Sequence, residues 1–369
     1  MKIGFDIRPF LSGETGVGVY FKNLLHAMAK IDRDNIFYLF SSSFKEKFPE
    51  ELLPDFKNRR FRNLRIPVSV LNFFWFRFSF PPMGMFFGHR LDITHSPNPL
   101  YIPGGKKKII TIHDLSFLDS PDLAMPEAAR YFSKKISRSI KKADAIIAVS
   151  EFTRSRIKEI FGKNAYEKTS VIYHGSDINE VAEKKPAFEV PEKYFLFTGT
   201  IEPRKNLAVL IRGFSLALKD IEGIKLILAG KEGSQASEIR RLISVLKLED
   251  NITITGYLPR EELKYLYAHA DSLVFPSHYE GFGLPVLEAA FSGIPSIVSD
   301  IEVFREIFKE YPLYFEKDDP ESLAKALILI VSDNKLRDKK KREAIETGKK
   351  FSWEKAAKQT LELYDKTGK

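Results

Sequence analysis

The chain has 369 residues, 44% of them hydrophobic and 29% charged, and this length favours two domains over a single core. It contains no cysteine, which excludes disulfides, thiol catalysis and thiolate-bound zinc. A formal net charge of +9 is compatible with binding to nucleic acid, to an anionic membrane surface or to anionic small ligands. No nucleic-acid-binding motif is visible, so we do not expect a nucleic-acid partner.

Targeting and membrane signals are not visible either. The sequence starts with an apolar strand pattern, without a basic segment ahead of a long apolar stretch, so no secretory signal is expected. No run of about 18 uncharged apolar residues predicts a transmembrane helix. We therefore expect a cytoplasmic protein.

The first predicted strand, residues 2–7, leads into a glycine loop that contains Gly13, Gly16 and Gly18 and then into a helix. Strand, glycine loop and helix are the phosphate-binding arrangement of a first Rossmann unit. The glycine spacing differs from G-x-G-x-x-G, and the second predicted strand, residues 36–40, has no clear acid at its end, which weakens a dehydrogenase interpretation. A tight turn without a ligand is the alternative.

The region 57–88 combines two unusual compositions. Residues 57–65 are strongly basic, and residues 68–87 are crowded with phenylalanine and one tryptophan. Basic and aromatic side chains together are typical of a surface that rests on anionic lipid. The alternative is that the aromatic side chains pack into the first domain.

Two further strands, residues 91–96 and 108–115, carry His95 and His113 near their carboxyl ends. Ligands of open α/β sheets bind at the carboxyl ends of strands, so both histidines are candidates. For His95 we favour a structural role. An amphipathic helix at 128–142 and a buried strand at 145–149 follow.

Residues 184–191 contain two prolines, charged residues and little else, which is the composition of a linker. The strand and helix alternation then restarts at 194–198, followed by Gly199 and the adjacent cations Arg204 and Lys205. A guanidinium binds two phosphate oxygens at once, and an ammonium adds a point charge. Taken alone, such a pair is more often only a solvated surface.

The most informative stretch begins after the predicted strand 272–275. A glycine-rich crossover leads into a helix at 284–291, with Glu280 before the turn and Glu288 within the helix. Free amides at a helix start attract anions. Because a carboxylate accepts two hydrogen bonds from a vicinal diol, acids on both sides of a phosphate site suit a nucleotide sugar.

The two acids match the E-x7-E motif of the retaining glycosyltransferases of family 4, and residues 199–206 resemble the G-x-x-x-x-R-K-[GN] signature of that family. The resemblance covers nearly the whole chain. It implies an α/β protein of the GT-B fold, with two Rossmann-like, doubly wound parallel-sheet domains that face each other across a cleft. The implied domains are an acceptor-binding domain at 1–183, a nucleotide-sugar-binding domain at 184–350, and a helix at 351–369 that crosses back to the first domain.

The resemblance also implies roles for individual residues. His113 is expected beside the transferred sugar, Arg204 and Lys205 at the diphosphate, Glu280 at the sugar hydroxyls and Glu288 at the ribose. The first four of these form the expected catalytic set. The expected donor-binding residues are Gly16, Gly18, Gly199, Gly230, Tyr257, Leu258, Phe282, Gly283, Leu284 and Glu288.

The expected reaction is the transfer of a hexose, with retention and without a divalent metal or other cofactor, in glycan or polysaccharide biosynthesis. GDP-mannose is the first choice of donor, followed by UDP-glucose and UDP-N-acetylglucosamine. The expected partners are the nucleotide sugar, a saccharide or lipid-linked acceptor, and a membrane surface contacted through 57–88. A sugar-nucleotide epimerase and a dinucleotide-binding protein are the alternatives.

Overall fold

The computed structural model describes residues 1–12, 15–44, 48–123 and 126–368; Gly13 of the first glycine loop lies outside these ranges. The chain forms two compact units. Unit 1 comprises Met1–Asp119, Pro126–Gly175 and Ser352–Lys369, and unit 2 comprises Ser120–Met125 and Ser176–Phe351. Apart from the short segment Ser120–Met125, the chain leaves unit 1 at Gly175, ahead of the segment expected as the linker, and returns to it at Ser352.

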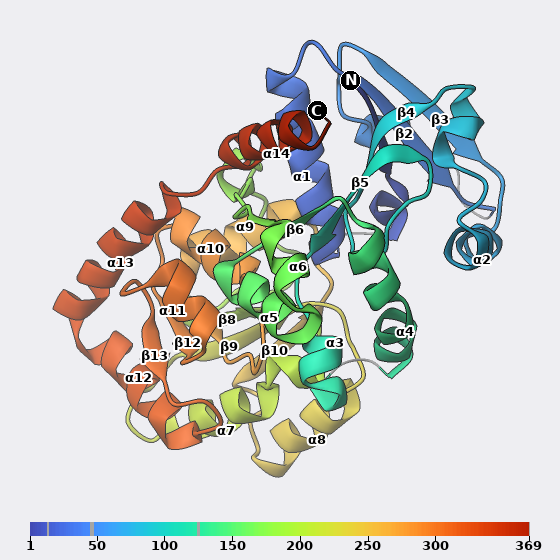
Figure 1. Cartoon of the computed structure of the whole chain (residues 1–369). Coiled ribbons are helices and arrows are strands. Elements are labelled where there is room, and N and C mark those ends of the chain that lie inside the picture. Colours follow the sequence, from blue (N-terminus) through green and yellow to red (C-terminus); the bar gives the residue numbers. More distant parts are fainter. Residues whose placement is uncertain (13–14, 45–47, 124–125, 369) are drawn as a thin grey trace. The chain divides into compact units, whose positions relative to one another are not determined.

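Unit 1 contains a seven-stranded parallel sheet with the strand order β3-β2-β1-β4-β5-β6-β7 (Figure 1). Both faces of such a sheet are covered by helices, so its strands are mostly apolar. The strands are β1 (Lys2–Asp6), β2 (Ile36–Ser42), β3 (Arg59–Leu64), β4 (Leu91–Ser96), β5 (Gly105–Ile112), β6 (Ala145–Ala148) and β7 (Thr169–Val171).

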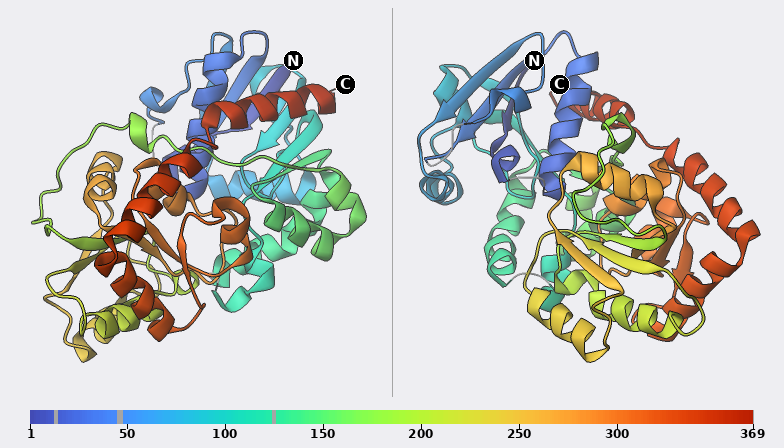
Figure 2. Two further views of the ribbon diagram at one scale, coloured as in Figure 1. Left: turned by 90° about the vertical axis from the view of Figure 1, so that its left-hand side faces the viewer. Right: turned by 180° about the vertical axis from the view of Figure 1, so that it is seen from behind.

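The helices of unit 1 include the last one in the chain. They are α1 (Gly16–Ile31), α2 (Val68–Phe78), α3 (Ser116–Asp119), α4 (Pro126–Lys142), α5 (Glu151–Phe161), α6 (Lys163–Glu167) and α14 (Trp353–Gly368). In Figures 1 and 2 the red α14 lies beside the blue α1, and these two helices contact each other. Short 3-10 turns in this unit are η1 (Arg8–Ser12), η2 (Glu50–Leu52) and η3 (Met83–Phe87).

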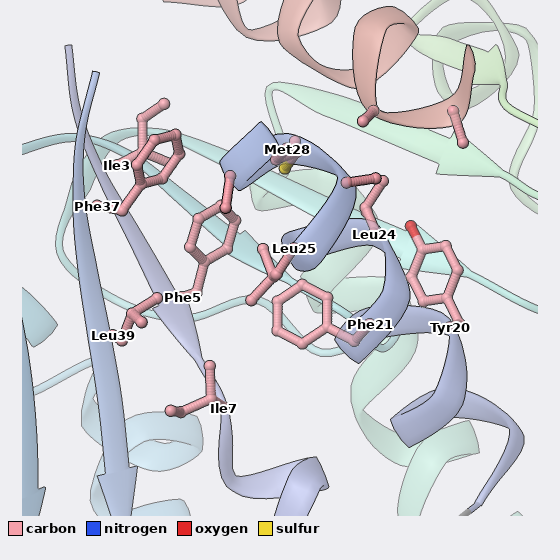
Figure 3. Packing of buried hydrophobic residues seen from close by; sticks show 14 of the residues in the cluster. Ile3, Phe5, Ile7, Tyr20, Phe21, Leu24, Leu25, Met28, Phe37 and Leu39 are labelled. Carbon is pink, nitrogen blue, oxygen red and sulfur yellow. The ribbon is translucent and has the colours of Figure 1, made fainter. Parts of the chain in front are cut away.

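The main core of unit 1 lies between α1 and the first two strands. Figure 3 shows Phe5 of β1 and Phe37 of β2 facing Phe21 and Leu25 of α1. The rings of Phe5 and Phe21 meet edge to face, with centroids 5.6 Å apart. All four side chains are fully or almost fully buried, so α1 is held on the sheet chiefly by apolar contact.

The basic part and the aromatic part of region 57–88 form different elements, a strand and a helix. Its basic part forms β3, an edge strand with exposed arginines, where charge discourages pairing with another chain. In α2, Trp75 is buried in the core, whereas Phe73, Phe74 and Phe78 are 60%, 43% and 58% exposed. The expectation that the aromatic side chains pack inward therefore holds for Trp75 but not for these three phenylalanines.

Unit 2 has a six-stranded parallel sheet with the order β10-β9-β8-β11-β12-β13. Its strands are β8 (Tyr194–Thr198), β9 (Lys225–Ala229), β10 (Ile252–Gly256), β11 (Ser272–Phe275), β12 (Ser296–Ser299) and β13 (Leu313–Phe315). Its helices are η4 (Pro121–Leu123), η5 (Ile178–Glu180), η6 (Pro203–Lys205), α7 (Leu207–Ala217), α8 (Ala236–Val245), α9 (Arg260–His269), α10 (Leu284–Phe291), α11 (Glu302–Phe308), α12 (Pro320–Ser332) and α13 (Asn334–Gly348).

The strand order reverses direction once in each sheet, between β1 and β4 in unit 1 and between β8 and β11 in unit 2. In doubly wound sheets the crevice outside the carboxyl ends of the strands at this reversal is where ligands bind. The predicted α/β class with two doubly wound parallel sheets is confirmed. Across the described ranges, no helix combines the length and apolar character needed to cross a membrane.

Candidate active site

The loops that follow β8 and β11, on either side of the strand reversal in unit 2, are joined directly. The N–H of His278 donates a hydrogen bond to the carbonyl oxygen of Arg204, with 2.9 Å between the two atoms. Arg204 and Lys205 form the 3-10 turn η6, and Asn206, in the left-handed region at φ 52°, turns the chain into α7. This connection brings the two expected cations to the loop that carries Glu280.

Glu280 binds both cations. Its Oε1 lies 2.6 Å from Nζ of Lys205, and its Oε2 lies 3.0 Å from Nη1 of Arg204. Arg204 also donates from Nη1 to the carbonyl of Tyr279 at 3.2 Å and from Nη2 to Glu202 at 2.9 Å. Lys205 and Glu280 are each only 7% exposed, so this ion cluster is largely removed from water.

The charge state of Glu280 follows from these contacts. Burial works to raise the pKa of its carboxyl, but the charges of Arg204 and Lys205 together outweigh burial and hold the pKa below its usual value. Glu280 is therefore a carboxylate at neutral pH. It orients two cations that would otherwise repel each other.

The turn between β11 and α10 requires glycine at its last position. Gly283 has φ +100°, and a Cβ at this position would lie 2.7 Å from Cε1 of Phe304. The ring of Phe282 is buried, so the main chain is the part of this residue suited to meet a ligand. The N–H groups of Gly283 and Leu284 stand at the start of α10, where a helix offers them no acceptor, and such groups attract anions.

Glu288, on the first turns of α10, is held by an arginine that the sequence analysis missed. Its Oε1 lies 2.5 Å from Nη1 of Arg260, and Arg260 also forms an ion pair with Asp177. Arg260 is the first residue of α9. A cation at a helix start faces the positive end of the helix dipole, and this unfavourable placement is the signal that would have drawn attention to Arg260.

The glycine ends of β8 and β9 touch each other. A Cβ on Gly230 would lie 2.0 Å from the carbonyl oxygen of Gly199, so no other residue fits this position. The neighbouring loop presents Tyr257, 47% exposed, whose ring centroid lies 5.2 Å from Nζ of Lys231, while Leu258 is buried. The expected donor-binding residues of unit 2 thus lie at the carboxyl ends of four adjacent strands.

His113 lies just after β5 in unit 1 and is half-buried. Its Nε2 donates to the carbonyl of Pro97 at 2.9 Å, which leaves Nδ1 as the unprotonated nitrogen. Burial lowers the pKa of His113, so the ring is neutral. Asp114, next in sequence, instead accepts from the N–H and hydroxyl of Ser116 at the start of α3.

Gly16 and Gly18 form the first turn of α1. The hydroxyl oxygen of Thr15 accepts from the N–H of Gly18 at 3.2 Å, so this amide serves the helix cap, while Gly16 is exposed. Tyr20, one turn further along α1, places its ring 4.7 Å from the ring of His113. Unit 1 therefore groups His113 with the start of α1, as unit 2 groups the ion cluster with the turn at Gly283.

His95 has the structural role favoured by the sequence analysis. It is fully buried, and its two ring nitrogens lie 2.5 Å from the hydroxyl of Tyr364 and 2.9 Å from that of Thr111. Burial lowers the pKa of His95 to about 3. His95 therefore connects α14 to the sheet. The described residues contain no group of three or more His, Cys, Asp or Glu side chains arranged to hold a metal ion.

Solved structures that are similar to this chain support its fold class. Sucrose-phosphate synthase from Thermosynechococcus elongatus aligns over 99% of this chain and 98% of its own, with a TM-score of 0.78 and 21% identity. HepE from Anabaena, in complex with UDP-glucose, aligns over 99% and 100% with a TM-score of 0.71 and 19% identity. These similarities confirm the GT-B fold, in which two Rossmann-type domains occupy one chain.

The sequence comparisons give the family. Residues 15–180 match Glycosyltransferase Family 4, and residues 179–350 match Glycosyl transferases group 1. The chain belongs to these glycosyltransferases, as its motifs predicted. O-antigen chain mannosyltransferase B of Escherichia coli is 29% identical over 99% of both chains, and O-antigen chain mannosyltransferase RfbU of Salmonella typhimurium is 32% identical over 63% of this chain and 62% of its own.

Proposed function

We propose that this glycosyltransferase transfers a hexose from a nucleotide-diphosphate sugar, with retention of anomeric configuration, to a saccharide or lipid-linked acceptor. The observation that carries this proposal is the buried cluster of Arg204, Lys205 and Glu280 at the strand reversal of unit 2. GDP-mannose is our first choice of donor. One relative that aligns over nearly the whole chain and one that aligns over part of it are both named mannosyltransferases.

Breaking the bond between an anomeric carbon and a diphosphate separates an oxocarbenium-like sugar from an anionic leaving group. Positive charge at the leaving group therefore lowers the barrier. In our proposal Arg204 and Lys205 bind the diphosphate oxygens, and the N–H groups of Gly283 and Leu284 add hydrogen bonds. With two cations in place, the leaving group needs no divalent metal.

The two acids bind the two ends of the donor. Glu280 keeps Arg204 and Lys205 aligned and accepts hydrogen bonds from sugar hydroxyls. Glu288, held in place by Arg260, accepts from the ribose diol. Tyr257 and Leu258 border the nucleobase.

The proposed reaction uses no covalent nucleophile of the protein. We propose that the leaving phosphate takes the proton of the acceptor hydroxyl as the new bond forms. The unprotonated Nδ1 of His113 then orients a hydroxyl of the sugar or acceptor by accepting its hydrogen bond.

A melting-temperature screen with GDP-mannose, UDP-glucose, UDP-N-acetylglucosamine and NAD tests this function. A ligand at about 100 times its dissociation constant stabilises the folded state by roughly 2.7 kcal/mol. We expect one nucleotide sugar to raise the melting temperature, the Lys205→Ala variant to lose this effect, and the exposed control Lys219→Ala to keep it. Stabilisation by NAD alone contradicts the proposal, and conversion of the donor to an isomer without transfer identifies an epimerase.

We also propose that α2 and its flanks rest on an anionic membrane surface. Phe73, Phe74, Phe78 and Phe80 are between 43% and 60% exposed, which is unusual for large aromatic side chains. The neighbouring strand β3 supplies exposed arginines. Exposed rings beside basic side chains match the interfacial region of an anionic bilayer.

A further inference from the structure

Two residues of unit 2 that are not glycine have left-handed backbone conformations close to the ion cluster in sequence or through contacts. Asn206 has φ 52° and ends the turn η6, and Asp318 has φ 70° in the loop between β13 and α12. Asparagine and aspartate tolerate this region better than most residues do, but glycine adopts it at the lowest cost. A side chain at such a position can make contacts that glycine cannot, and these two side chains contact each other.

A single oxygen of Asp318 joins two loops of the candidate site. Nδ2 of Asn206 donates a hydrogen bond to Oδ1 of Asp318, with 2.8 Å between the two atoms. Nδ1 of His278 lies 3.1 Å from the same oxygen. Because an ionised carboxylate only accepts hydrogen bonds, Nδ1 of His278 carries the proton in this contact. Oδ1 of Asp318 therefore connects the end of η6 to the loop that follows β11.

His278 takes part in this connection through both its ring and its main chain. Burial lowers the pKa of its ring, the charge of Asp318 opposes this effect, and the charge of Lys317 adds to it. The ring is therefore neutral at neutral pH and donates to Asp318 as a neutral imidazole. The main-chain N–H of His278 donates to the carbonyl of Arg204, so the loop after β11 is joined to η6 directly as well as through Asp318.

The position of Asp318 is fixed by the start of a helix. Asp319, the next residue, caps α12, because its Oδ1 accepts from the N–H groups of Glu321 and Ser322 at 2.8 Å and 3.2 Å. Helix α12 packs against α7, which begins directly after Asn206. The contact between these two helices therefore sets the distance from Asp318 to η6.

We infer that Asp318 is a positioning residue of the donor site. Its Oδ1 holds η6, which carries Arg204 and Lys205, at the distance from the loop after β11 at which the cations and the N–H groups of that loop bind one diphosphate together. The inference rests on the proposed function and deepens it, because Asp318 lies outside both family motifs. Glu280 balances the charge of the two cations, whereas Asp318 fixes the backbone that carries them.

The chemistry of Asp318 makes direct contact with the donor unfavourable. A carboxylate and a diphosphate repel each other, so Asp318 acts through Asn206 and His278 rather than on the ligand. Binding sites of this kind need their groups within about 0.5 Å of the productive geometry. Loss of the shared oxygen should therefore weaken diphosphate binding although no group that touches the ligand is changed.

Three substitutions separate the oxygen of Asp318 from its charge and from its backbone conformation. Asp318→Asn keeps an acceptor oxygen and tolerates the left-handed region, but removes the charge. Asp318→Gly removes the oxygen and relieves the backbone strain, which offsets part of the lost hydrogen bonding. Lys247→Gly is the matched control, because Lys247 is an exposed residue of unit 2 with φ 55°, between α8 and β10.

Isothermal titration calorimetry of the full chain with GDP and with UDP tests the inference. We expect at least one of these nucleotides to bind the wild type and to bind Asp318→Gly about tenfold more weakly. Asp318→Asn and Lys247→Gly should bind it within about twofold of the wild type.

Nitrogen NMR shifts of the His278 ring give a second measurement that does not depend on a ligand. Nδ1 should carry the proton in the wild type and in Asp318→Asn, where an oxygen accepts from it. In Asp318→Gly this acceptor is absent, and the proton should move to Nε2.

The inference is overturned if Asp318→Gly binds the nucleotide as well as Lys247→Gly does, or if Asp318→Asn is weakened as much as Asp318→Gly. It is also overturned if the protonated nitrogen of His278 is the same in all variants. Nucleotide binding by the wild type that Asp318→Gly retains rejects the inference alone. A wild-type chain that binds neither GDP nor UDP contradicts the proposed function and, with it, the inference.

Discussion

Lys205 and Glu280 are 75 positions apart in sequence and 2.6 Å apart in the structure. Both side chains are buried, and the charge of each offsets the free-energy cost of burying the charge of the other. Nζ of Lys205 also lies 4.6 Å from the ring centroid of Phe275, at the end of β11. At the scale of single residues the candidate site is therefore a set of charges whose positions are determined before any ligand binds.

The first prediction concerns Lys205→Ala. If Lys205 stabilises the departing diphosphate, the variant should lose roughly 100-fold in kcat, as when one oxyanion donor is removed. It should also be destabilised by about 3 kcal/mol, because Glu280 remains buried with only part of its charge compensated. Single-turnover kinetics with the donor identified by the screen, together with thermal unfolding, measure both effects. A kcat equal to that of Lys219→Ala rules out the assigned role.

The second prediction concerns the turn at Gly283. Gly283→Ala forces both a φ of +100° and a contact of 2.7 Å with Phe304, whereas Gly223→Ala forces only a φ of +71° in open space. Left-handed strain costs on the order of 1–3 kcal/mol. We expect Gly283→Ala to lower the melting temperature more than Gly223→Ala does. Equal losses in the two variants mean that the turn has room for a side chain.

The third prediction concerns the pH dependence of stability. The pKa of His95 is about 3 in the folded chain and 6.5 as its ordinary value, so the unfolded chain binds a proton that the folded chain does not between these values. His95 therefore supports stability fully above pH 6.5 and progressively less as the pH falls toward 3, by roughly 1.4 kcal/mol per pH unit.

Replacing His95 with glutamine should remove this part of the pH dependence. Unfolding of the wild type and of His95→Gln, followed between pH 7.5 and 5, measures the difference in slope. The exposed Val245→Ser, which removes no titratable group, serves as the control and should keep the wild-type slope. A wild-type slope in His95→Gln means that His95 binds as many protons in the folded chain as in the unfolded chain, so that folding does not lower its pKa.

At the scale of elements, α2 has two unlike faces. Leu71 and Trp75 anchor it to the core, and Nε1 of Trp75 donates to the carbonyl of Pro81 at 2.9 Å. Phe73, Phe74 and Phe78 contact one another on the exposed side, with ring centroids 5.5 Å to 6.0 Å apart. An apolar cluster held in place by a buried tryptophan is well suited to a partner surface.

The fourth prediction concerns this cluster. The triple variant Phe73→Ser, Phe74→Ser, Phe78→Ser should abolish sedimentation with phosphatidylglycerol vesicles, because the three rings supply the apolar contact. Wild-type binding should also weaken with added salt, as expected for arginines that face anionic lipid. The double variant Val245→Ser, Leu329→Ser removes exposed apolar side chains from unit 2 and should bind like the wild type. Equal vesicle binding by both variants contradicts the membrane proposal.

At the scale of the whole molecule, the chain builds two doubly wound sheets, and its last helix belongs to the first of them. His95 binds Tyr364 of α14 at 2.5 Å, and Trp353 at the start of α14 lies with its ring centroid 5.9 Å from that of Tyr20. Apart from the short segment Ser120–Met125, which belongs to unit 2, the order in sequence is unit 1, unit 2 and unit 1 again, so a complete unit 1 requires both ends of the chain.

The fifth prediction concerns the placement of the proposed donor site in unit 2. Hydrogen exchange with the donor bound should slow chiefly at 199–206 and 276–288 in unit 2, where the proposed contacts lie. Mass spectrometry of peptides from a digest measures this pattern, and donor protection limited to unit 1 contradicts the assignment of the donor site.

Much of this protein is determined by its sequence, because the relevant signals are local. Short apolar runs followed by glycine and then by helical periodicity define βα units, and the predicted helix 284–291 coincides with α10 (Leu284–Phe291). The R-K and E-x7-E motifs identify the family, since few folds require these residues at this spacing. The basic stretch that forms β3 escaped prediction because an edge strand needs no apolar alternation on its exposed side.

Tertiary structure decided the features that depend on residues distant in sequence. The order of strands in the sheet brings Lys205 to Glu280, and the contacts of η5 with both α9 and α10 place Arg260 beside Glu288. The fold also selected Trp75 for the core and left Phe73 exposed, although the two are near neighbours in sequence. The contacts of Asp318 with Asn206 and His278 exist only because α12 packs against α7, and no local pattern encodes a contact among loops that follow three different strands.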